Sequence, residues 1–583
     1  MAFTGGFDVH ALGQRLKSTA PDRPVYVTAI LVALYLYFFH DDARRRALAL
    51  AKFAPTVARL ERAALPIAIA LSIAVFFVGV RQGVLVAEAS DAWGYVSQAD
   101  LWLARDLTIA QPVARDVPWP NAGWTFAPLG YRPARDDPGV LVPTYPPGLP
   151  VLMAMGTRLV GTCGPFLISP LLGGLTIWFT YLLGVRVSSR AIGLAAAALL
   201  ATSPIFLLMV VHPWSDAPAT AFLVLGLVLA LSGSRWRAFW TGAAVSMAIF
   251  IRPNLVFIGA VFVAFIVLSA KPAPGEAPLR VRARELLWFS IGGAPLVLAV
   301  AALNTVLYGA PWSAGHGSLE ALYSWSFIWR NLIDYPRWLW GTETPVIALS
   351  AVPLIVWHRT RERRPLLALL TSYIAAVWLS YLFYRAYGEW QYLRFLLPTI
   401  PVLLVLASCG VAIVLGRLSG AGERIAAAVL VIACVLSLRV GVIRGEDVLG
   451  YWRPGMAFTS VGDYVRQHLP ANAAILTVQH SGSIRYYSNR LTLRWDFLPP
   501  EWWPRALHTL SERGYRPYVL LTSSEEEAFR SRFRLSTVED APGTIVATFQ
   551  GAEVRLYDPL RLAATAPASI PPVRAFPCGC FWR

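Results

Sequence analysis

Long apolar runs alternate with short polar segments between residues 24 and 443. Inside lipid a chain must satisfy its own backbone hydrogen bonds, and an α-helix of about 20 apolar residues does so while crossing the bilayer. The pattern predicts an α-helical polytopic membrane protein with about twelve transmembrane helices. The expected spans are residues 24–40, 64–80, 166–186, 190–211, 217–233, 237–251, 254–270, 286–307, 343–357, 366–384, 395–416 and 425–443.

Three stretches need separate treatment. The apolar piece 149–160 is too short to cross a bilayer, so we expect an interfacial helix there. Residues 237–270 must hold two short crossings, and Pro253 supplies the break because proline cannot continue a helix. The run 24–40 is followed by acidic and basic residues rather than by a small-residue cleavage site. It is therefore expected to be an anchor and not a removed signal peptide.

Lys and Arg in the short loops give the orientation. The segment 41–63 is basic, and so is every second loop after it. The positive-inside rule places these loops in the cytoplasm. The first long loop, residues 81–148, and the chain after residue 444 are then expected on the exterior face.

A composition typical of a soluble domain begins after about residue 444. Short strand and helix patterns alternate there, which predicts a small exterior α/β domain over residues 444–561. The expected strands are 474–478, 491–495, 518–522, 544–549 and 553–557, and the expected helices are 483–488, 502–513 and 524–533. The expected role of this domain is that of a lid that guides an acceptor over the exterior cavity, or of a stabilising cap without substrate contact.

The predicted domain organisation thus has four parts. Residues 1–63 form an N-terminal segment with an additional membrane helix, and residues 64–443 form the transmembrane domain with the exterior loop. The α/β domain follows. The Ala- and Pro-rich tail 562–583 is expected to be disordered.

Overall composition agrees with a membrane protein. The chain has 583 residues, of which 56% are hydrophobic and 15% charged, whereas soluble domains have about 25% charged residues. The net charge of +17 does not indicate a nucleic-acid partner, because the basic residues are dispersed among short loops. The five cysteines do not form a disulfide framework. No His lies near Cys578 and Cys580, so no structural metal is expected there.

The exterior loop 81–148 carries the first candidate chemistry. Glu88, Asp91 and Tyr95 follow the span 64–80 within a few residues, and Tyr145 precedes Pro-Pro-Gly at the end of the loop. At the boundary between water and lipid a carboxylate can stay ionised while it faces a lipid-borne molecule.

Three more ionisable residues are expected at the exterior ends of other spans. Asp216 lies in a Ser-Asp-Ala-Pro turn, Arg252 lies in Ile-Arg-Pro, and Arg394 opens the span 395–416. Together with Asp91 they place two carboxylates and two guanidinium groups at one membrane level. A carboxylate can take the proton from an acceptor hydroxyl, while Arg binds a departing phosphate.

Structural interpretations of the same residues remain open at this point. Asp91 and Asp216 are favoured residue types for capping a helix N-terminus. Arg252 and Arg394 are also typical of interfacial arginines whose charged ends reach toward water. Tyr145 and the following Pro-Pro-Gly could determine the shape of the loop without binding anything.

Taken together, these motifs resemble the GT-C superfamily of membrane glycosyltransferases, which includes protein O-mannosyltransferases and the bacterial aminoarabinose transferase of lipid A. The resemblance covers about residues 64–443 and the downstream exterior domain. The motifs that carry it are Ser90–Tyr95, Tyr145–Gly148, Ser215–Pro218, Ile251–Pro253 and Tyr392–Pro398.

The resemblance implies inverting transfer of a sugar from a polyprenyl-phosphate carrier to an acceptor hydroxyl on a lipid, glycan or protein. It also implies multi-pass placement in a bacterial inner membrane, with the active site facing the periplasm. Asp91 would be the catalytic base, and Asp216 a supporting carboxylate. A divalent cation, if one takes part, would be bound by these two residues. The substrate-binding residues would be Glu88, Tyr95, Tyr145, Arg252 and Arg394.

This chain departs from relatives in two places. Some members have adjacent Asp-Glu in the first loop, whereas Ala92 follows Asp91 here. Members of the aminoarabinose type have Lys before the double proline, where this chain has Thr144-Tyr145. Donor recognition is therefore expected to differ from both groups.

Three other classes of function remain as alternatives. One is a non-catalytic scaffold, which would leave the shared exterior placement of the four ionisable groups to chance. A transporter or flippase of lipid-linked glycans should show paired halves and broken helices near the bilayer midplane, and no symmetric halves are visible here. A polymerase or ligase of such glycans would typically depend on Arg and His in a late loop rather than on a first-loop Asp.

Overall fold

The structure, a computed structural model of the chain, describes residues 7–11, 14–18, 43–315, 322–418, 421–533, 544–549 and 552–559. The predicted span 24–40 and the tail 562–583, with Cys578 and Cys580, lie outside the described residues. Near the N-terminus, β1 (Phe7–Ala11) and β2 (Gln14–Ser18) form an antiparallel pair.

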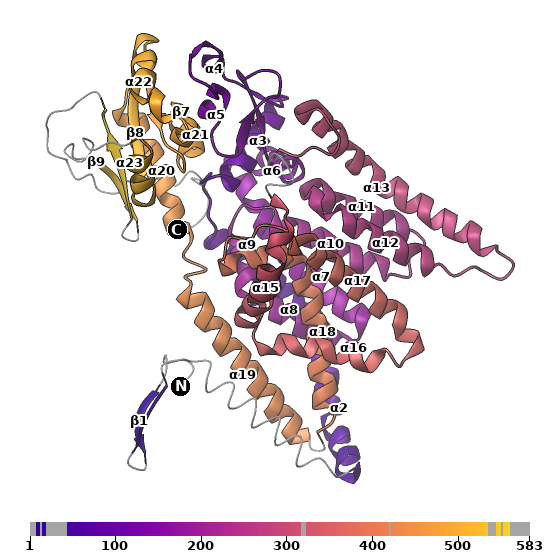
Figure 1. Cartoon of the computed structure of the whole chain (residues 1–583). Coiled ribbons are helices and arrows are strands. Elements are labelled where there is room, and N and C mark those ends of the chain that lie inside the picture. Colours follow the sequence, from indigo (N-terminus) through magenta and orange to yellow (C-terminus); the bar gives the residue numbers. More distant parts are fainter. Residues whose placement is uncertain are drawn as a thin grey trace.

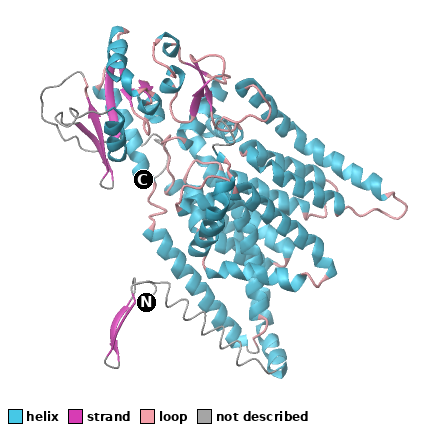
Figure 2. Cartoon of the chain, in the orientation of Figure 1, coloured by secondary structure: helices cyan, strands magenta, loops and turns pink. Residues whose placement is uncertain are grey.

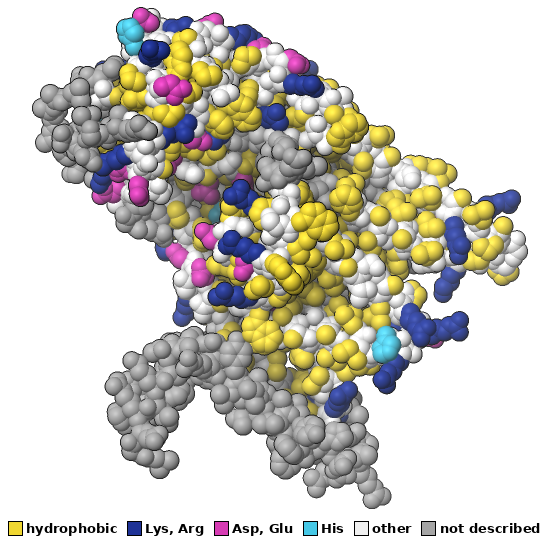
Figure 3. Space-filling view, in the orientation of Figure 1, with side chains coloured by type: hydrophobic (Ala, Val, Ile, Leu, Met, Phe, Trp, Pro, Cys, Tyr) yellow, Lys and Arg dark blue, Asp and Glu magenta, His cyan; other side chains and the backbone are white. Residues whose placement is uncertain are grey.

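Helices make up the larger part of the molecule, and the two larger sheets lie at one end, which is the top of Figures 1 and 2, whereas the β1–β2 pair lies at the lower left. Hydrophobic side chains cover much of the visible face of the helical part in Figure 3, and Lys and Arg gather at its lower right end, away from the sheets. An apolar flank with a basic end agrees with an integral membrane protein whose basic loops lie on one side.

Among the residues that the structure describes, six helical segments are long and apolar enough to cross a membrane, or up to eight if each of two bent pairs counts as one span. Three of them lie within a single helix: Glu61–Arg81 in α2 (Ala43–Arg81), all of α13 (Pro278–Tyr308), and Ala427–Gly445 in α19 (Ala421–Gly445). The segment Gly148–Val187 contains α6 (Gly148–Val160), η1 (Gly161–Cys163) and α7 (Gly164–Val187). The other two are Arg361–Leu382, with η5 (Arg361–Arg363) and α17 (Arg364–Leu382), and Trp390–Leu415, with η6 (Trp390–Thr399) and α18 (Ile400–Leu415).

The predicted count of about twelve spans is therefore supported only in part. Three predicted spans are shorter apolar helices in the structure: α10 (Asp216–Ala230), α11 (Arg237–Ile251), and η2 (Pro253–Leu255) with α12 (Val256–Leu268). The break at Pro253 lies where the sequence predicts it. An interfacial position for α6 stays a prediction.

One predicted span, 190–211, is not a continuous helix. It consists of α8 (Arg190–Ala201) and α9 (Pro204–Val211), which meet at 64°. Pro204 has no N–H to donate, and the side chain of Ser203 accepts a hydrogen bond from the backbone of Phe206 and so begins a new helix.

The predicted span 343–357 corresponds to η4 (Pro345–Ser350) and α16 (Ala351–Trp357), which are long enough for a membrane span only together with the helical segment before them. That segment is η3 (Trp325–Phe327) with α15 (Ile328–Glu343), and the two arms meet at an angle of 108°. Thr344 has a φ of 68° at the bend, and Pro345 follows it. Both features end the first helix.

After residue 444 the chain forms a five-stranded sheet in the order β7-β6-β8-β10-β9. The strands are β6 (Ala473–Leu476), β7 (Leu491–Leu493), β8 (Arg516–Thr522), β9 (Thr544–Phe549) and β10 (Ala552–Tyr557). The helical segments are α20 (Trp452–His468), α21 (Ser481–Ser488), η7 (Trp495–Phe497), η8 (Pro500–Trp502), α22 (Trp503–Glu512) and α23 (Ser523–Phe533). These elements lie close to the predicted ones, except that α20 was not predicted.

The long loop 81–148, which the sequence predicts on the exterior face, contains α3 (Asp91–Ala104), α4 (Val113–Asp116), α5 (Ala122–Phe126) and a three-stranded sheet of β3 (Ile109–Ala110), β5 (Val140–Pro143) and β4 (Tyr131–Pro133). Buried side chains of α4 and α5 share one hydrophobic cluster with β6, β7 and α22. The loop and the C-terminal sheet therefore pack as one layer above the membrane helices (Figure 1).

Candidate active site

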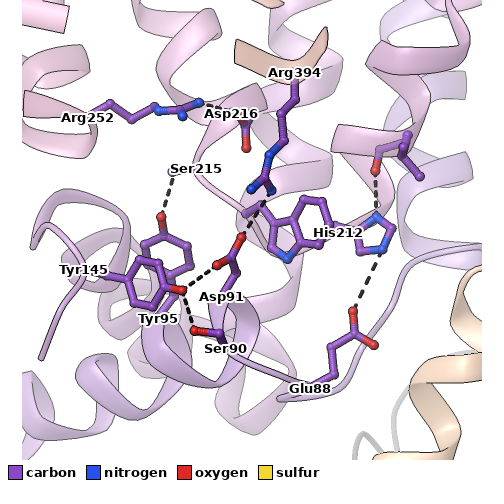
Figure 4. Close-up of polar contacts among 12 residues, drawn as sticks. Glu88, Ser90, Asp91, Tyr95, Tyr145, His212, Ser215, Asp216, Arg252 and Arg394 are labelled. Carbon is purple, nitrogen blue, oxygen red and sulfur yellow. Dashed lines mark hydrogen bonds and ion pairs between the residues drawn. The ribbon is translucent and has the colours of Figure 1, made fainter. Parts of the chain in front are cut away.

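Asp91 is the first residue of α3, and Ser90 occupies the N-cap position without a side-chain capping bond. The carboxylate of Asp91 instead contacts residues from two other parts of the chain (Figure 4). Its Oδ1 accepts a hydrogen bond of 2.5 Å from the hydroxyl of Tyr145, and its Oδ2 accepts one of 3.2 Å from Nη1 of Arg394. These contacts hold the carboxylate in one orientation.

Tyr145 is fixed by close packing against α3. An added Cβ on Gly94 would lie 2.4 Å from ring carbons of Tyr145, so only glycine allows the ring to approach this closely. The Tyr145 hydroxyl also lies 2.8 Å from Oγ of Ser90. Burial, with the charge of Asp91, holds the pKa of Tyr145 well above its usual range, so its hydroxyl keeps the proton that it donates to Asp91.

The second carboxylate is paired with the second arginine. Asp216 is the first residue of α10, and its Oδ1 accepts a charged hydrogen bond from Nη1 of Arg252. Their side chains are 3% and 13% exposed, so little water screens the pair. Arg252 stands at the bend before Pro253, and its Cζ lies 5.9 Å from the ring centre of Tyr381.

Two bridges bring the pairs together. Tyr95, one turn along α3 from Asp91, donates a hydrogen bond of 3.0 Å to Oγ of Ser215, the neighbour of Asp216. The Cζ of Arg394 lies 4.8 Å from the ring centre of Trp214 and 5.4 Å from that of Phe395. Aromatic faces of this kind stabilise a guanidinium group.

Six of the seven predicted site residues line one cavity of about 1240 Å³: Asp91, Tyr95, Tyr145, Asp216, Arg252 and Arg394. The rest of the lining is largely apolar, and α12, α13 and α17 contribute to it. Among these residues Phe257 is 70% exposed and Leu379 is 58% exposed, and the nearby Trp312 and Trp325 also line the cavity. The cavity thus joins a charged end to an apolar side that reaches the molecular surface.

Glu88, the seventh residue, lies apart from this cavity. It lines a second cavity of about 260 Å³, together with Asp91 and Arg394, which therefore stand between the two spaces. Oε1 of Glu88 is 3.9 Å from Nε2 of His212. Burial, with the charge of Asp91, raises the pKa of Glu88 to about 8, and burial lowers the pKa of His212 to about 4. Near neutral pH both side chains are accordingly uncharged.

Sequence reasoning missed Ser90, His212, Trp214 and Ser215 as members of the site. Each lies within four residues of a predicted carboxylate, so proximity in the chain was the available signal. Asp91 and Asp216 are not N-cap residues in the structure, because Ser90 and Ser215 take those positions.

A divalent cation would compete with an arginine for either carboxylate of the site. Each carboxylate is already bound by an arginine, and in the described part of the chain no group of three or more His, Cys, Asp or Glu is placed to bind a metal. Mg²⁺ is commonly bound by one or two carboxylates together with water and a substrate phosphate, so a cation at Asp91 or Asp216 requires that the arginine on that carboxylate moves away.

No protein-family model and no sequence of a curated protein matches the chain. Solved structures do match. ArnT from Cupriavidus metallidurans, bound to undecaprenyl phosphate, is 13% identical, with a TM-score of 0.54 over 86% of this chain and 99% of that chain. Its apo form is 15% identical, with a TM-score of 0.52 over the same shares. The apo oligosaccharyltransferase from Archaeoglobus fulgidus is 14% identical, with a TM-score of 0.51 over 83% of this chain and 74% of that chain.

At these identities the likeness concerns the fold. Both neighbours are GT-C glycosyltransferases, and the match extends over the membrane helices and beyond them. The resemblance predicted from the sequence motifs is confirmed at this level: the chain has the fold of the GT-C membrane glycosyltransferases.

Proposed function

We propose that the chain is an inverting glycosyltransferase that moves a sugar from a polyprenyl-phosphate carrier to an acceptor hydroxyl. One observation carries the proposal. The paired groups Asp91–Arg394 and Asp216–Arg252 line the charged end of a cavity whose other walls are apolar and open at the surface. A polyprenyl-phosphate sugar matches this cavity, because it joins an apolar tail to a charged phosphate.

The donor phosphate would bind at the two arginines. Arg presents a planar fork of N–H groups that suits phosphate oxygens, and a site of low water content strengthens such contacts. The polyprenyl tail would lie against the apolar lining, with the exposed side chains of Phe257 and Leu379 marking where it meets lipid. The bound undecaprenyl phosphate of the ArnT structure supports this class of ligand.

Asp91 would act as the general base. In an inverting transfer, its carboxylate takes the proton of the acceptor hydroxyl as the hydroxyl oxygen bonds to the anomeric carbon. The bond from that carbon to the phosphate oxygen breaks on the opposite side, and the polyprenyl phosphate leaves with its electron pair. Arg252 and Arg394 would stabilise the charge that develops on this phosphate.

Tyr145 and Tyr95 would hold neighbouring side chains in position and would not transfer protons themselves. The Tyr145 hydroxyl holds Oδ1 of Asp91, and the Tyr95 hydroxyl holds Ser215 next to Asp216. Asp216 would keep Arg252 oriented. Catalysis of this kind depends on groups that are preorganised before the substrate arrives.

We place the reaction on the exterior face of a bacterial inner membrane. The positive-inside rule puts the basic loops in the cytoplasm, and the basic end of the molecule in Figure 3 is the end away from the sheets. The site residues follow α2, α9 and α11 at their other ends, next to the exterior loop. The acceptor would be a lipid, a glycan or a protein.

The test is transfer of a labelled sugar from undecaprenyl-phosphate-linked donors in proteoliposomes. The wild type should transfer label, and Arg394→Ala should lose nearly all of it. Arg337→Ala, at an exposed position of α15, should transfer like the wild type. Movement of the lipid-linked glycan across the bilayer without sugar transfer would instead support a transporter and overturn the proposal.

A further inference from the structure

The C-terminal α/β domain contacts the helix that begins with Asp91, and it does not cover the cavities. Among the described residues, every residue that lines either cavity precedes Ile400. A lid over the substrate would contribute lining residues. Instead, α21 contacts α3 (Figure 1), and α20 contacts the segment that leads into α3.

The closest contact joins α21 to α3. An added Cβ on Gly482 would lie 2.1 Å from Cδ1 of Trp93, so the glycine lets the indole pack directly on the backbone of α21. The ring of Tyr486 meets the same indole edge-on at 5.8 Å. Trp93 is two residues after Asp91 and is 4% exposed.

A second contact holds the chain just before α3. The backbone N–H of Ala87 donates a hydrogen bond of 2.8 Å to the hydroxyl of Tyr487 on α21. An added Cβ on Gly455 of α20 would lie 3.0 Å from Oε2 of Glu88. The segment that carries Glu88 and Asp91 is therefore bounded by the α/β domain on one side.

A third contact locks α21 to the remainder of the exterior loop. The guanidinium of the half-buried Arg485 donates to Oε1 of Gln111 at 2.7 Å, to the carbonyl of Phe126 at 2.6 Å and to Oγ1 of Thr492 at 2.7 Å. The first two partners belong to the exterior loop and the third to β7, the edge strand of the sheet. Oγ of Ser481 also accepts a hydrogen bond of 3.1 Å from the backbone of Leu129.

We propose that α21 is a positioning element for the reaction: it fixes α3, and through α3 it fixes the carboxylate of Asp91 between the two cavities. Tyr487, Gly482 and Arg485 are the residues that transmit this position, and none of them touches substrate. The inference rests on the proposed function for its kinetic readout. The structural half of it can be measured without catalysis.

Tyr487→Phe is the most specific test of this role, because it removes one hydroxyl and leaves the ring packing in place. Tyr464→Phe is the matched control, since Tyr464 belongs to α20 of the same domain and stacks on His468 of its own helix. Loss of one hydrogen bond should lower kcat about 3–10-fold while the KM for the donor and the melting temperature stay close to wild type. The control should change neither constant.

A double-mutant cycle tests the Gly482–Trp93 contact. Gly482→Ala should lower kcat strongly in the wild-type background, because the methyl group forces α3 away. It should have little further effect in the Trp93→Ala background, where the indole is absent. Additive effects of the two substitutions would show that the contact does not transmit position and would overturn the proposal.

Amide hydrogen exchange supplies the readout that is independent of activity. Exchange of residues 87–97 should be faster in Tyr487→Phe than in wild type and unchanged in Tyr464→Phe. Unchanged exchange in both would contradict the positioning role. If the wild type transfers no sugar but exchange responds as expected, the proposed function fails and the attachment of α3 to α21 stands. If Tyr487→Phe lowered kcat, donor affinity and melting temperature together, the domain would only stabilise the fold, and the positioning role would be contradicted.

Discussion

Arg394 donates a hydrogen bond to Asp91 across 303 positions of sequence, and the two side chains stand together where the two cavities meet. A guanidinium group so placed can contact a phosphate in the larger cavity while it still touches the carboxylate. The same carboxylate is held from its other oxygen by Tyr145. The proposed base and the proposed phosphate-binding group therefore position one another before any substrate binds.

Arg252→Lys should weaken donor binding more than it slows the chemical step. Lys is a point charge that cannot form the paired N–H contacts of Arg, and the buried carboxylate of Asp216 would lose part of its partner. We expect the KM for the donor to rise about tenfold. Steady-state kinetics at varied donor concentration measure it. Arg237→Lys, at the other end of α11 in an ion pair with Glu285, should leave KM unchanged.

Glu88 should make the stability of the protein depend on pH. Its raised pKa means that the folded protein retains a proton that the unfolded chain releases, so stability falls as the pH rises from about 4.5 through about 8. Glu88→Gln should remove this fall, on the order of 2–4 kcal/mol. Melting temperatures between pH 5 and pH 9 measure it. Exposed Glu389→Gln is the control, and an equally steep pH dependence in Glu88→Gln would contradict the assignment.

A fully buried ion pair holds the last span to the helical core. Nη2 of Arg439 on α19 donates to Oε2 of Glu343, and its Nη1 donates to the carbonyl of Leu199 and, at 2.8 Å, to Oγ1 of Thr202. Glu343 also accepts a bond from Ser203. Removing one partner of a buried pair costs about 3–5 kcal/mol because the other charge stays buried.

Glu343→Gln should accordingly lower the melting temperature strongly. Replacing both residues with apolar side chains, Glu343→Leu with Arg439→Met, should recover part of the loss because no lone charge remains. Recovery should be incomplete, since the carbonyl of Leu199 loses its donor at the break between α8 and α9. A double variant as unstable as the sum of the two single ones would show that the charges are not coupled.

Chelation should leave transfer unchanged. Both carboxylates of the site are bound by arginines, and the described residues offer no third carboxylate or imidazole to complete a metal site. Sugar transfer measured before and after dialysis against EDTA should agree within error. Loss of activity that added Mg²⁺ or Mn²⁺ restores would show that a cation replaces one of the two ion pairs.

Hydrophobic pattern alone located most of the helices, because a long apolar run has few other folded solutions in lipid. It failed where a polar or conformational feature interrupts the run. Arg439 and Ser203 satisfy the helix ends at the 64° bend of α8 and α9, and Thr344 with its positive φ turns the chain after α15. A window that averages hydropathy does not register such local contacts.

The site residues were identified by motif, but their partners were not. The pairing of Asp91 with Arg394, and of Asp216 with Arg252, depends on how helices far apart in sequence pack, and no single-sequence pattern contains that information. The same holds for the cluster shared by the exterior loop and the C-terminal sheet, which were predicted as separate parts. The division into domains stays a proposal.

Turnover of Asp91→Asn compared with wild type tests the central claim most directly. Asn keeps the size of Asp and can still accept from Tyr145, but it is not a base for the acceptor hydroxyl. With labelled donor in proteoliposomes, transfer should fall at least about 100-fold, while undecaprenyl phosphate still binds and the melting temperature is maintained. Turnover close to wild type would contradict Asp91 as the base and with it the proposed mechanism.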